Sequence, residues 1–157
     1  MTSLKADAHP LPLIPVLAPV YQNLSGFAHP LLRAAVGLML VPHGAQKLFG
    51  WFGGYGLEAT GNFFAGKLGL PASLALMAGL IEFAGGLMLA LGLFTRPVAA
   101  LVTGLMVVAV VQVHWGAGFF WTAGGFEYPL LWGVAALTFV LSGGGRYSLD
   151  ALLGREI

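Results

Sequence analysis

Four long apolar runs fill most of the chain, and a proline lies at or near the start of each. The runs cover residues 30–49, 71–94, 97–115 and 128–142, and the fourth can be extended back to residue 126. Proline fits the first turn of a helix, where its missing N–H group would have no partner. A helix that crosses a bilayer needs about 20 apolar residues, so the first three runs are long enough and the fourth is short. The pattern predicts four membrane-spanning helices.

The connections between these runs differ in length and composition. Residues 95–96 predict a tight turn between the second and third helices, and residues 57–67 predict a short helix at the membrane–water interface. The loop 116–127 is rich in Phe and Trp, which favour that interface. After the fourth run, Ser148 is a candidate N-cap of a short C-terminal helix, with Asp150 favourable in its first turn.

The N-terminal residues 1–28 are set apart by their prolines. Pro12, Pro15 and Pro19 interrupt the apolar stretch there, and proline in a helix interior removes a hydrogen bond. The order of basic, apolar and cleavage regions that is typical of a signal peptide is not seen. We therefore predict that residues 1–28 form a flexible or membrane-surface arm, with plain disorder as an equal alternative. Residues 29–157 are expected to form one membrane domain.

The composition agrees with an integral membrane protein. Of the 157 residues, 58% are hydrophobic and 8% are charged, whereas a soluble domain carries roughly 25% charged residues. The chain has no cysteine, which excludes disulfides, thiolate metal sites and dithiol redox chemistry within it. Its seven Lys/Arg and six Asp/Glu nearly cancel, so nothing in the charge indicates nucleic-acid binding.

The basic residues predict the orientation of the helices. With a cytoplasmic N-terminus, five of the seven Lys and Arg residues lie on the cytoplasmic side and two on the outer side. Cytoplasmic loops of membrane proteins carry such an excess. The prediction is an all-α, four-helix membrane bundle with both termini in the cytoplasm. Arg33, Arg96 and Arg146 then act mainly as topology determinants, and Arg33 is also a candidate partner of Asp150.

Polar residues from all four predicted helices fall in the outer half of the membrane or near its midplane. His43 and Lys47 lie about 40° apart on the first helix. Glu82 lies about 16 Å into the second helix, with Gly and Ala residues three and four positions away, which favours a helix–helix interface. His114 ends the third helix and Glu127 opens the fourth. Because such groups are costly in hydrocarbon unless they have a partner or face water, we predict that these five residues line a ligand pocket.

Other residues are expected to shape this pocket. Pro42 favours a kink that opens a cavity, and Phe49, Trp51 and Trp115 are expected to form an apolar wall. Gln112 lies about 200° from His114 around the helix, so both face the pocket only if the helix end is distorted. No metal site is predicted, and a haem or metal held by two of the histidines, His43 and His114, is a minor alternative.

Each polar residue also has a purely structural interpretation. Lys47 is equally consistent with a side chain that reaches the membrane surface. His114 and Glu127 are consistent with interfacial residues that have no role, and Glu127 also complements the dipole of its own helix. Glu82 and His43 favour a role in a functional site or in a structural network. No catalytic residue is assigned, and whether the protein is an enzyme stays open.

Three segments resemble the DoxX family of small bacterial and archaeal membrane proteins. They are the pattern R-x9-H-G-x2-K-L in residues 33–48, IEFAGGLMLALGLFTRPVA in residues 81–99, and GGGRYSLD in residues 143–150. They occur in the order of the family and cover nearly all of residues 33–150. The resemblance implies a four-helix bundle in the cytoplasmic (inner) membrane of a bacterium or archaeon. It also implies an association with respiratory or redox complexes, including quinone-linked ones.

Two functions are compatible with these features. The first is a membrane subunit of a redox or respiratory complex that binds quinone in the outer-half pocket and receives electrons from a partner protein. The second is a non-catalytic membrane anchor or assembly partner for a redox or stress-response enzyme. Both imply lipid contact and a protein partner, and a homo-oligomer is compatible with either. A transporter is disfavoured, because the four short spans show no repeat and no pair of broken helices.

Overall fold

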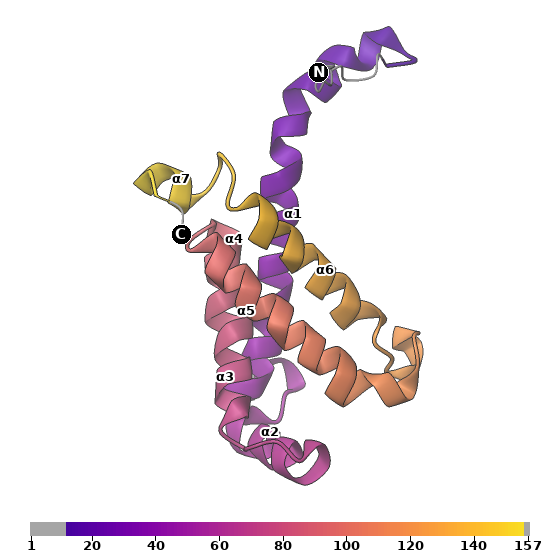
Figure 1. The fold of residues 1–157 in the computed structure, drawn as a ribbon, viewed down its shortest axis with the longest axis vertical. Helices are drawn as coiled ribbons and strands as arrows, with labels where there is room; N and C mark the ends of the chain where they lie inside the picture. The colour runs from indigo at the N-terminus through magenta and orange to yellow at the C-terminus, as the bar shows by residue number, and fades with distance from the viewer. Residues whose placement is uncertain (1–11, 156–157) are drawn as a thin grey trace, which may run out of the picture.

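The computed structural model describes residues 12–155, and all regular secondary structure in that range is helical (Figure 1). This confirms the all-α prediction. Elements labelled η are short 3-10 or π helices. In chain order the elements are η1 (Pro15–Leu17), α1 (Ala18–Phe49), η2 (Trp51–Gly53), α2 (Gly56–Phe63), η3 (Phe64–Leu68), α3 (Leu74–Leu80), η4 (Ile81–Gly85), α4 (Gly86–Leu91), α5 (Thr95–Val108), η5 (Ala109–His114), η6 (Trp115–Ala117), η7 (Trp121–Ala123), α6 (Glu127–Ser142) and α7 (Leu149–Leu153).

The first helix starts earlier than the apolar pattern predicts. α1 begins at Ala18, directly after the 3-10 turn η1. Pro19 is the second residue of α1, where the backbone N–H would have no helical partner, so this proline does not interrupt the helix. Pro30 and Pro42 lie inside the continuous helix. The expectation that prolines prevent a helix before residue 29 is therefore wrong for residues 18–28. Residues 1–11 of the predicted arm lie outside the described residues.

Three helical segments of the described chain are long and apolar enough to cross a membrane. They are Pro15–Phe49, Leu74–Leu91 and Thr95–Ala117. The second combines α3, η4 and α4, and the third combines α5, η5 and η6. α6 is apolar but shorter. These lengths agree with a helical membrane bundle, while a fourth crossing and the cytoplasmic position of both termini stay predictions.

The turn between α4 and α5 precedes residues 95–96. Gly92 and Phe94 have positive φ angles of 70° and 47°, and Thr95 already begins α5. A carboxylate from the C-terminal segment stabilises this turn, because Asp150 accepts hydrogen bonds from the N–H groups of Phe94 and Thr95 at 2.8 and 2.9 Å. The position of the turn therefore depends on a contact between residues far apart in the sequence, which the local pattern does not show.

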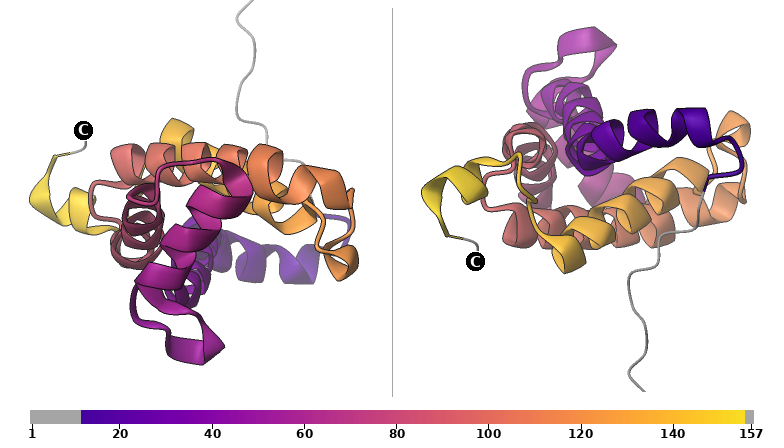
Figure 2. Two further views of the ribbon diagram at one scale, coloured as in Figure 1. Left: turned by 90° about the horizontal axis from the view of Figure 1, so that it is seen from below. Right: turned by 90° about the horizontal axis from the view of Figure 1, so that it is seen from above.

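The helices form two crossing pairs (Figure 1, Figure 2). α1 lies antiparallel to the α3–α4 segment, and α5 lies antiparallel to α6. Buried residues of all four helices meet where the pairs cross, in a cluster of Val36, Leu89, Val98, Ala99 and Phe139. Beyond this crossing the pairs diverge toward the end of the molecule where α2 lies. The helix predicted for residues 57–67 is present as α2 and η3.

Glycines allow α1 to approach the second helical segment closely. A Cβ atom at Gly37 would lie 2.4 Å from the carbonyl oxygen of Gly86, and one at Gly44 would lie 2.3 Å from the backbone nitrogen of Phe83. These distances are far below a van der Waals contact, so only glycine fits at either position. The close approach confirms that the small residues around Glu82 serve helix–helix contact.

The outer surface of the helices is largely apolar. Leu31, Leu101, Leu131 and Leu141 each expose more than half of their surface. A soluble protein rarely exposes a contiguous apolar surface of this extent. Together with the length of the helices, this surface indicates contact with membrane lipid.

Arg33 holds the C-terminal segment against the bundle. It is 3% exposed and donates hydrogen bonds to the carbonyl oxygens of Gly144 and Tyr147. Ser148 accepts a hydrogen bond from the Ala151 N–H at 3.1 Å, which confirms it as the N-cap of α7. No direct ion pair joins Arg33 to Asp150 in the described part of the chain. Instead, the two side chains bind different backbone groups of the same region, so Arg33 has a structural role besides any effect on topology.

Arg96 binds the C-terminal end of α6. Its guanidinium donates hydrogen bonds to the carbonyl oxygens of Val140 and Leu141 at 2.6 and 2.9 Å. The last carbonyls of a helix have no partner within it, and a cation there also complements the helix dipole. This arginine therefore joins α5 to α6, in addition to the topological role that the sequence suggests.

We predict that Asp150→Asn destabilises the fold at neutral pH. The carboxylate accepts three hydrogen bonds, from the N–H groups of Phe94 and Thr95 and from the Thr95 hydroxyl, and an amide can replace one oxygen acceptor but not both. The expected loss is about 2 kcal/mol, from hydrogen bonds to a charged group. Thermal unfolding of the detergent-solubilised protein measures it, with the exposed Glu58→Gln as a matched control that leaves stability unchanged.

The difference between wild type and Asp150→Asn should also depend on pH. Burial raises the pKa of Asp150, but the hydrogen bonds from Thr95 and Phe94 and the nearby charge of Arg33 outweigh it, so the pKa lies below its usual range. The stabilisation is then fully present above the ordinary aspartate pKa of about 3.9 and is lost as the pH falls through the lower folded value. A difference that persists unchanged through that range would contradict this prediction.

Candidate functional site

A cavity of about 900 Å³ lies where the two helix pairs diverge. We call it the large cavity. Its walls come from α1, α2 with η3, the α3–η4 segment, α5 with η5, and the start of α6. The lining residues are mostly apolar, with a few polar side chains among them. The polar and aromatic ones are His43, Gln46, Lys47, Tyr55, Thr60, Phe63, Phe64, Glu82, His114, Trp121, Tyr128 and Trp132.

An ion pair between α1 and η4 forms part of the cavity wall. The Lys47 ammonium lies 2.6 Å from Oε2 of Glu82, whose side chain is 8% exposed. Glu82 lies on the π helix η4, and π segments within α-helices frequently mark functional sites. The sequence left open whether Lys47 reaches the membrane surface or enters the site. In the structure its ammonium binds the buried carboxylate and lines the cavity.

His43 lies one helical turn before Lys47 on the same wall. Its ring meets the ring of Trp132 edge to face, with centroids 5.6 Å apart. Both residues line the cavity, so α1 and α6 contribute to it together. The edge-to-face contact positions the His43 ring. Within residues 12–155 no hydrogen bond holds either ring nitrogen, so a ligand can bind there.

His114 reaches the cavity from the opposite helix pair. It ends η5, which is also a π helix, and its Nδ1 lies 2.6 Å from the carbonyl oxygen of Gly124. The helix end is therefore distorted, which is the condition under which Gln112 and His114 would share one cavity. Only His114 lines the cavity, however, and Gln112 does not.

Four of the five polar residues predicted for the pocket line the large cavity: His43, Lys47, Glu82 and His114. Glu127 does not line it. Its Oε2 accepts a hydrogen bond from the Trp121 N–H at 3.1 Å, so the carboxylate closes the loop before α6. Glu127 was predicted to line the pocket because it lies at the same depth as the other polar residues. Its side chain instead binds a nearby backbone N–H group.

The residues expected to shape the pocket lie outside its lining. Phe49 packs on Trp51 and Phe83, with ring centroids 4.9 and 5.3 Å away, and Trp115 stacks on Phe126 at 5.2 Å. Pro42 is also not a lining residue. These aromatic side chains find partners on neighbouring segments, which their positions near helix ends did not reveal.

Other aromatic residues take their place, and the sequence reasoning missed them. Trp121 stacks on Tyr128 with centroids 5.3 Å apart, and Tyr128 lies 6.0 Å from Trp132. The spacing of Tyr128 and Trp132, one helical turn apart at the start of the fourth run, was the available signal. Tyr55 and Thr60 enter from the glycine-rich connection after α1. That connection therefore covers one end of the cavity.

Residues 12–155 contain no group of three or more His, Cys, Asp or Glu side chains placed to hold a metal ion. The two histidines that line the cavity, His43 and His114, come from different helix pairs.

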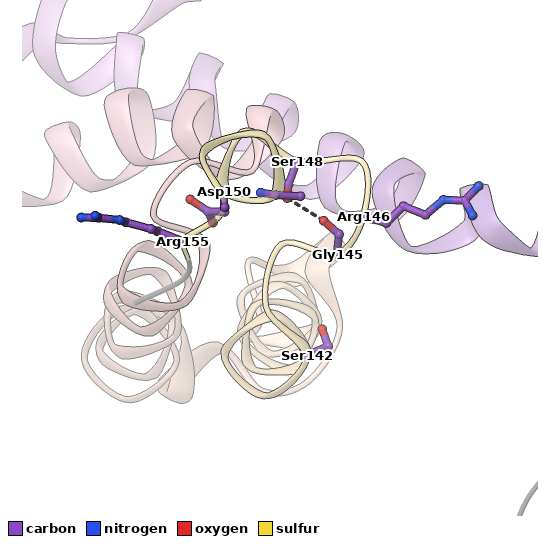
Figure 3. A pocket seen from close by; sticks show the side chains of 8 residues that line it. Ser142, Gly145, Arg146, Ser148, Asp150 and Arg155 are labelled. Atoms are coloured by element: carbon purple, nitrogen blue, oxygen red, sulfur yellow. Dashed lines mark hydrogen bonds between the residues drawn. The ribbon is translucent and has the colours of Figure 1, made fainter.

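A smaller cavity of about 310 Å³ lies beside α7 (Figure 3). Ser148 and Asp150 line it, but both already bind groups of the protein: Ser148 donates to the Gly145 carbonyl at 2.6 Å, and Asp150 holds the start of α5. Figure 3 shows Arg146 and Arg155 extending away on opposite sides. The polar groups of this cavity therefore already hold the C-terminal segment in place, and the candidate site is the large cavity.

The Lys47–Glu82 pair should show strong energetic coupling. Removing one partner leaves a charge in an apolar helix interface, which costs about 3–5 kcal/mol when fully buried and less here because Lys47 is partly exposed. Lys47→Met and Glu82→Leu should each destabilise the protein, and the double variant should be more stable than the sum of the two losses predicts. Thermal unfolding in detergent provides this double-mutant cycle, and strictly additive losses would contradict a direct pair.

Comparisons with known proteins place the chain among small membrane proteins. The model of the DoxX family matches residues 29–115. An uncharacterized protein of Haemophilus influenzae is 38% identical over 122 residues, which are 76% of this chain and 85% of the relative. A Bacillus subtilis protein described as "putative oxidoreductase CatD" is 33% identical over 120 residues, or 76% of this chain and 82% of the relative. No solved structure matches.

Proposed function

The chain belongs to the DoxX family, and on this premise we propose that it is the membrane subunit of a redox or respiratory complex that binds quinone in the large cavity. Electrons come from a partner protein, since the chain has no cysteine to hold an iron–sulfur cluster. The description of the Bacillus relative as an oxidoreductase supports a redox association.

The cavity itself carries the proposal. Its volume of about 900 Å³ falls within the range of roughly 300–1,000 Å³ that is usual for small-molecule sites. Such sites combine apolar walls with a few polar groups that orient the ligand. A quinone likewise combines an apolar tail with a polar head group. A membrane-embedded cavity of this kind can take it up from the bilayer.

The ion pair supplies a polar group without leaving a charge unpaired. An ammonium has three N–H donors, and Glu82 takes one from Lys47. The remaining donors are free to bind a head-group oxygen. His43 on the same wall offers a second polar contact. The aromatic rings of Tyr128 and Trp132 line the same cavity, and Trp132 contacts His43, so the walls suit a planar ring.

We further propose that the protein lies in the cytoplasmic membrane of a bacterium or archaeon, with both termini inside. The distribution of Lys and Arg along the sequence supports this orientation. The apolar outer surface of the helices supports the membrane location.

A second candidate function is a non-catalytic anchor or assembly partner for a redox or stress-response enzyme. The N-terminal half of α1 favours it, because this half extends beyond the crossing helices with Tyr21 58% and Leu24 59% exposed (Figure 1). In that case the Lys47–Glu82 pair fixes the bundle, and a partner binds elsewhere. Pull-down from native membranes separates the two functions. A partner complex that survives replacement of His43, Lys47, Glu82 and His114, with unchanged activity, would favour the anchor.

Filling the cavity should abolish quinone binding. Ala109 lines the cavity on η5, so Ala109→Phe places a ring where the ligand would lie. The matched control is Ala100→Phe on α5, at an exposed position outside the cavity. We expect quenching of tryptophan fluorescence by a decyl-substituted benzoquinone to saturate in wild type and in the control, since Trp121 and Trp132 line the site.

Ala109→Phe should weaken this binding at least about tenfold, the equivalent of one lost hydrogen bond or packed group. Circular dichroism shows whether both variants remain folded. Equal binding by Ala109→Phe and the control would place the ligand elsewhere, and no saturable binding by the wild type would overturn the proposed function.

A further inference from the structure

The contact between His114 and Gly124 fixes the hydrogen-bonding role of the histidine. A carbonyl oxygen only accepts, so Nδ1 of His114, 2.6 Å from the Gly124 oxygen, must carry the proton and donate it. In the neutral ring Nε2 is then an acceptor. This second nitrogen has no hydrogen-bond partner among residues 12–155, and His114 lines the large cavity. The cavity therefore contains an acceptor that lacks a donor.

The loop that holds this carbonyl is tightly folded. Gly124 has a φ of 80°, and a Cβ atom on the next residue, Gly125, would lie 2.3 Å from the Gly118 carbonyl oxygen. The N–H groups of Phe126 and Glu127 bind the carbonyls of Gly118 and Phe119 at 3.0 and 2.9 Å. The Gly124 carbonyl is therefore held in place before any ligand arrives, and with it the ring orientation of His114.

We propose that His114 makes the large cavity selective for a hydroquinone, the reduced and hydroxyl-bearing form of its ligand. This inference rests on the proposed quinone site. A hydroquinone hydroxyl can donate to Nε2, whereas a quinone presents only carbonyl oxygens, which accept. With the oxidised form, two acceptors face each other and Nε2 has no donor to bind. Sites built to bind a hydroxyl reject analogues that lack it for this reason.

Two other polar residues of the cavity, Lys47 and His43, do not discriminate in this way. The Lys47 ammonium donates equally well to a carbonyl or to a hydroxyl oxygen. His43 contacts the Trp132 ring and no carbonyl, so no contact fixes which of its nitrogens is protonated. His114 differs from both, because the contact with Gly124 fixes Nε2 as an acceptor.

The test is the ratio of affinities for a decyl-substituted hydroquinone and for the corresponding benzoquinone, measured anaerobically in detergent. We expect wild type to bind the hydroquinone about tenfold more tightly, as the loss of one hydrogen bond predicts. His114→Phe should bring the ratio close to one, and His114→Gln, whose side-chain oxygen accepts, should restore part of it. Gln112→Leu, two residues away and outside the cavity, is the matched control and should keep the wild-type ratio.

The ratio separates recognition from a structural effect. His114→Phe also removes the bond to Gly124, but a loosened loop would weaken both ligands alike and leave the ratio unchanged. Wild type that binds both forms equally, or a ratio insensitive to His114→Phe, would overturn this inference and leave the quinone site standing. Wild type that binds neither form would overturn both. If His114→Phe does not fold, the wild-type ratio and His114→Gln decide the question.

Discussion

The burial of Glu82 between two helices is the constraint on which the site depends. A carboxylate in an apolar helix interface is tolerated when a cation meets it at close range. Lys47 does so at 2.6 Å, and it can do so because α1 and η4 approach more closely than side chains would normally allow. The contact of Gly44 with the backbone of Phe83, next to Glu82, shows how close the two helices are. The close backbone packing of α1 against η4 therefore makes the Lys47–Glu82 ion pair possible.

The same helix pair forms one wall of the large cavity, and the α5–α6 pair forms the other. The pairs are joined at their crossing by a small apolar cluster and by the two side chains Arg33 and Asp150, which bind the C-terminal segment and the turn before α5. A second apolar cluster of Leu40, Val102, Met106 and Ala136 continues the contact between the pairs. The cavity lies beyond it, where the pairs diverge toward α2.

Much of this arrangement was predictable from the sequence, and the failures have physical reasons. Apolar runs identified the helices, and polar groups within them identified His43, Lys47, Glu82 and His114. Glu127 was misplaced because residue depth says nothing about a local partner such as the Trp121 N–H. The early start of α1 was missed because Pro19 lies in the first turn, where a proline costs no hydrogen bond. The position of the turn before α5 was missed because a distant residue, Asp150, determines it.

The central claim is that the large cavity holds a lipid-soluble quinone. Native purification in a mild detergent, followed by mass spectrometry of the bound small molecules, tests it most directly. The expected result is a quinone that co-purifies in an amount comparable to the protein and is depleted when the cavity is filled by Ala109→Phe. Phospholipid alone, or quinone retained equally by wild type and Ala109→Phe, would contradict the claim.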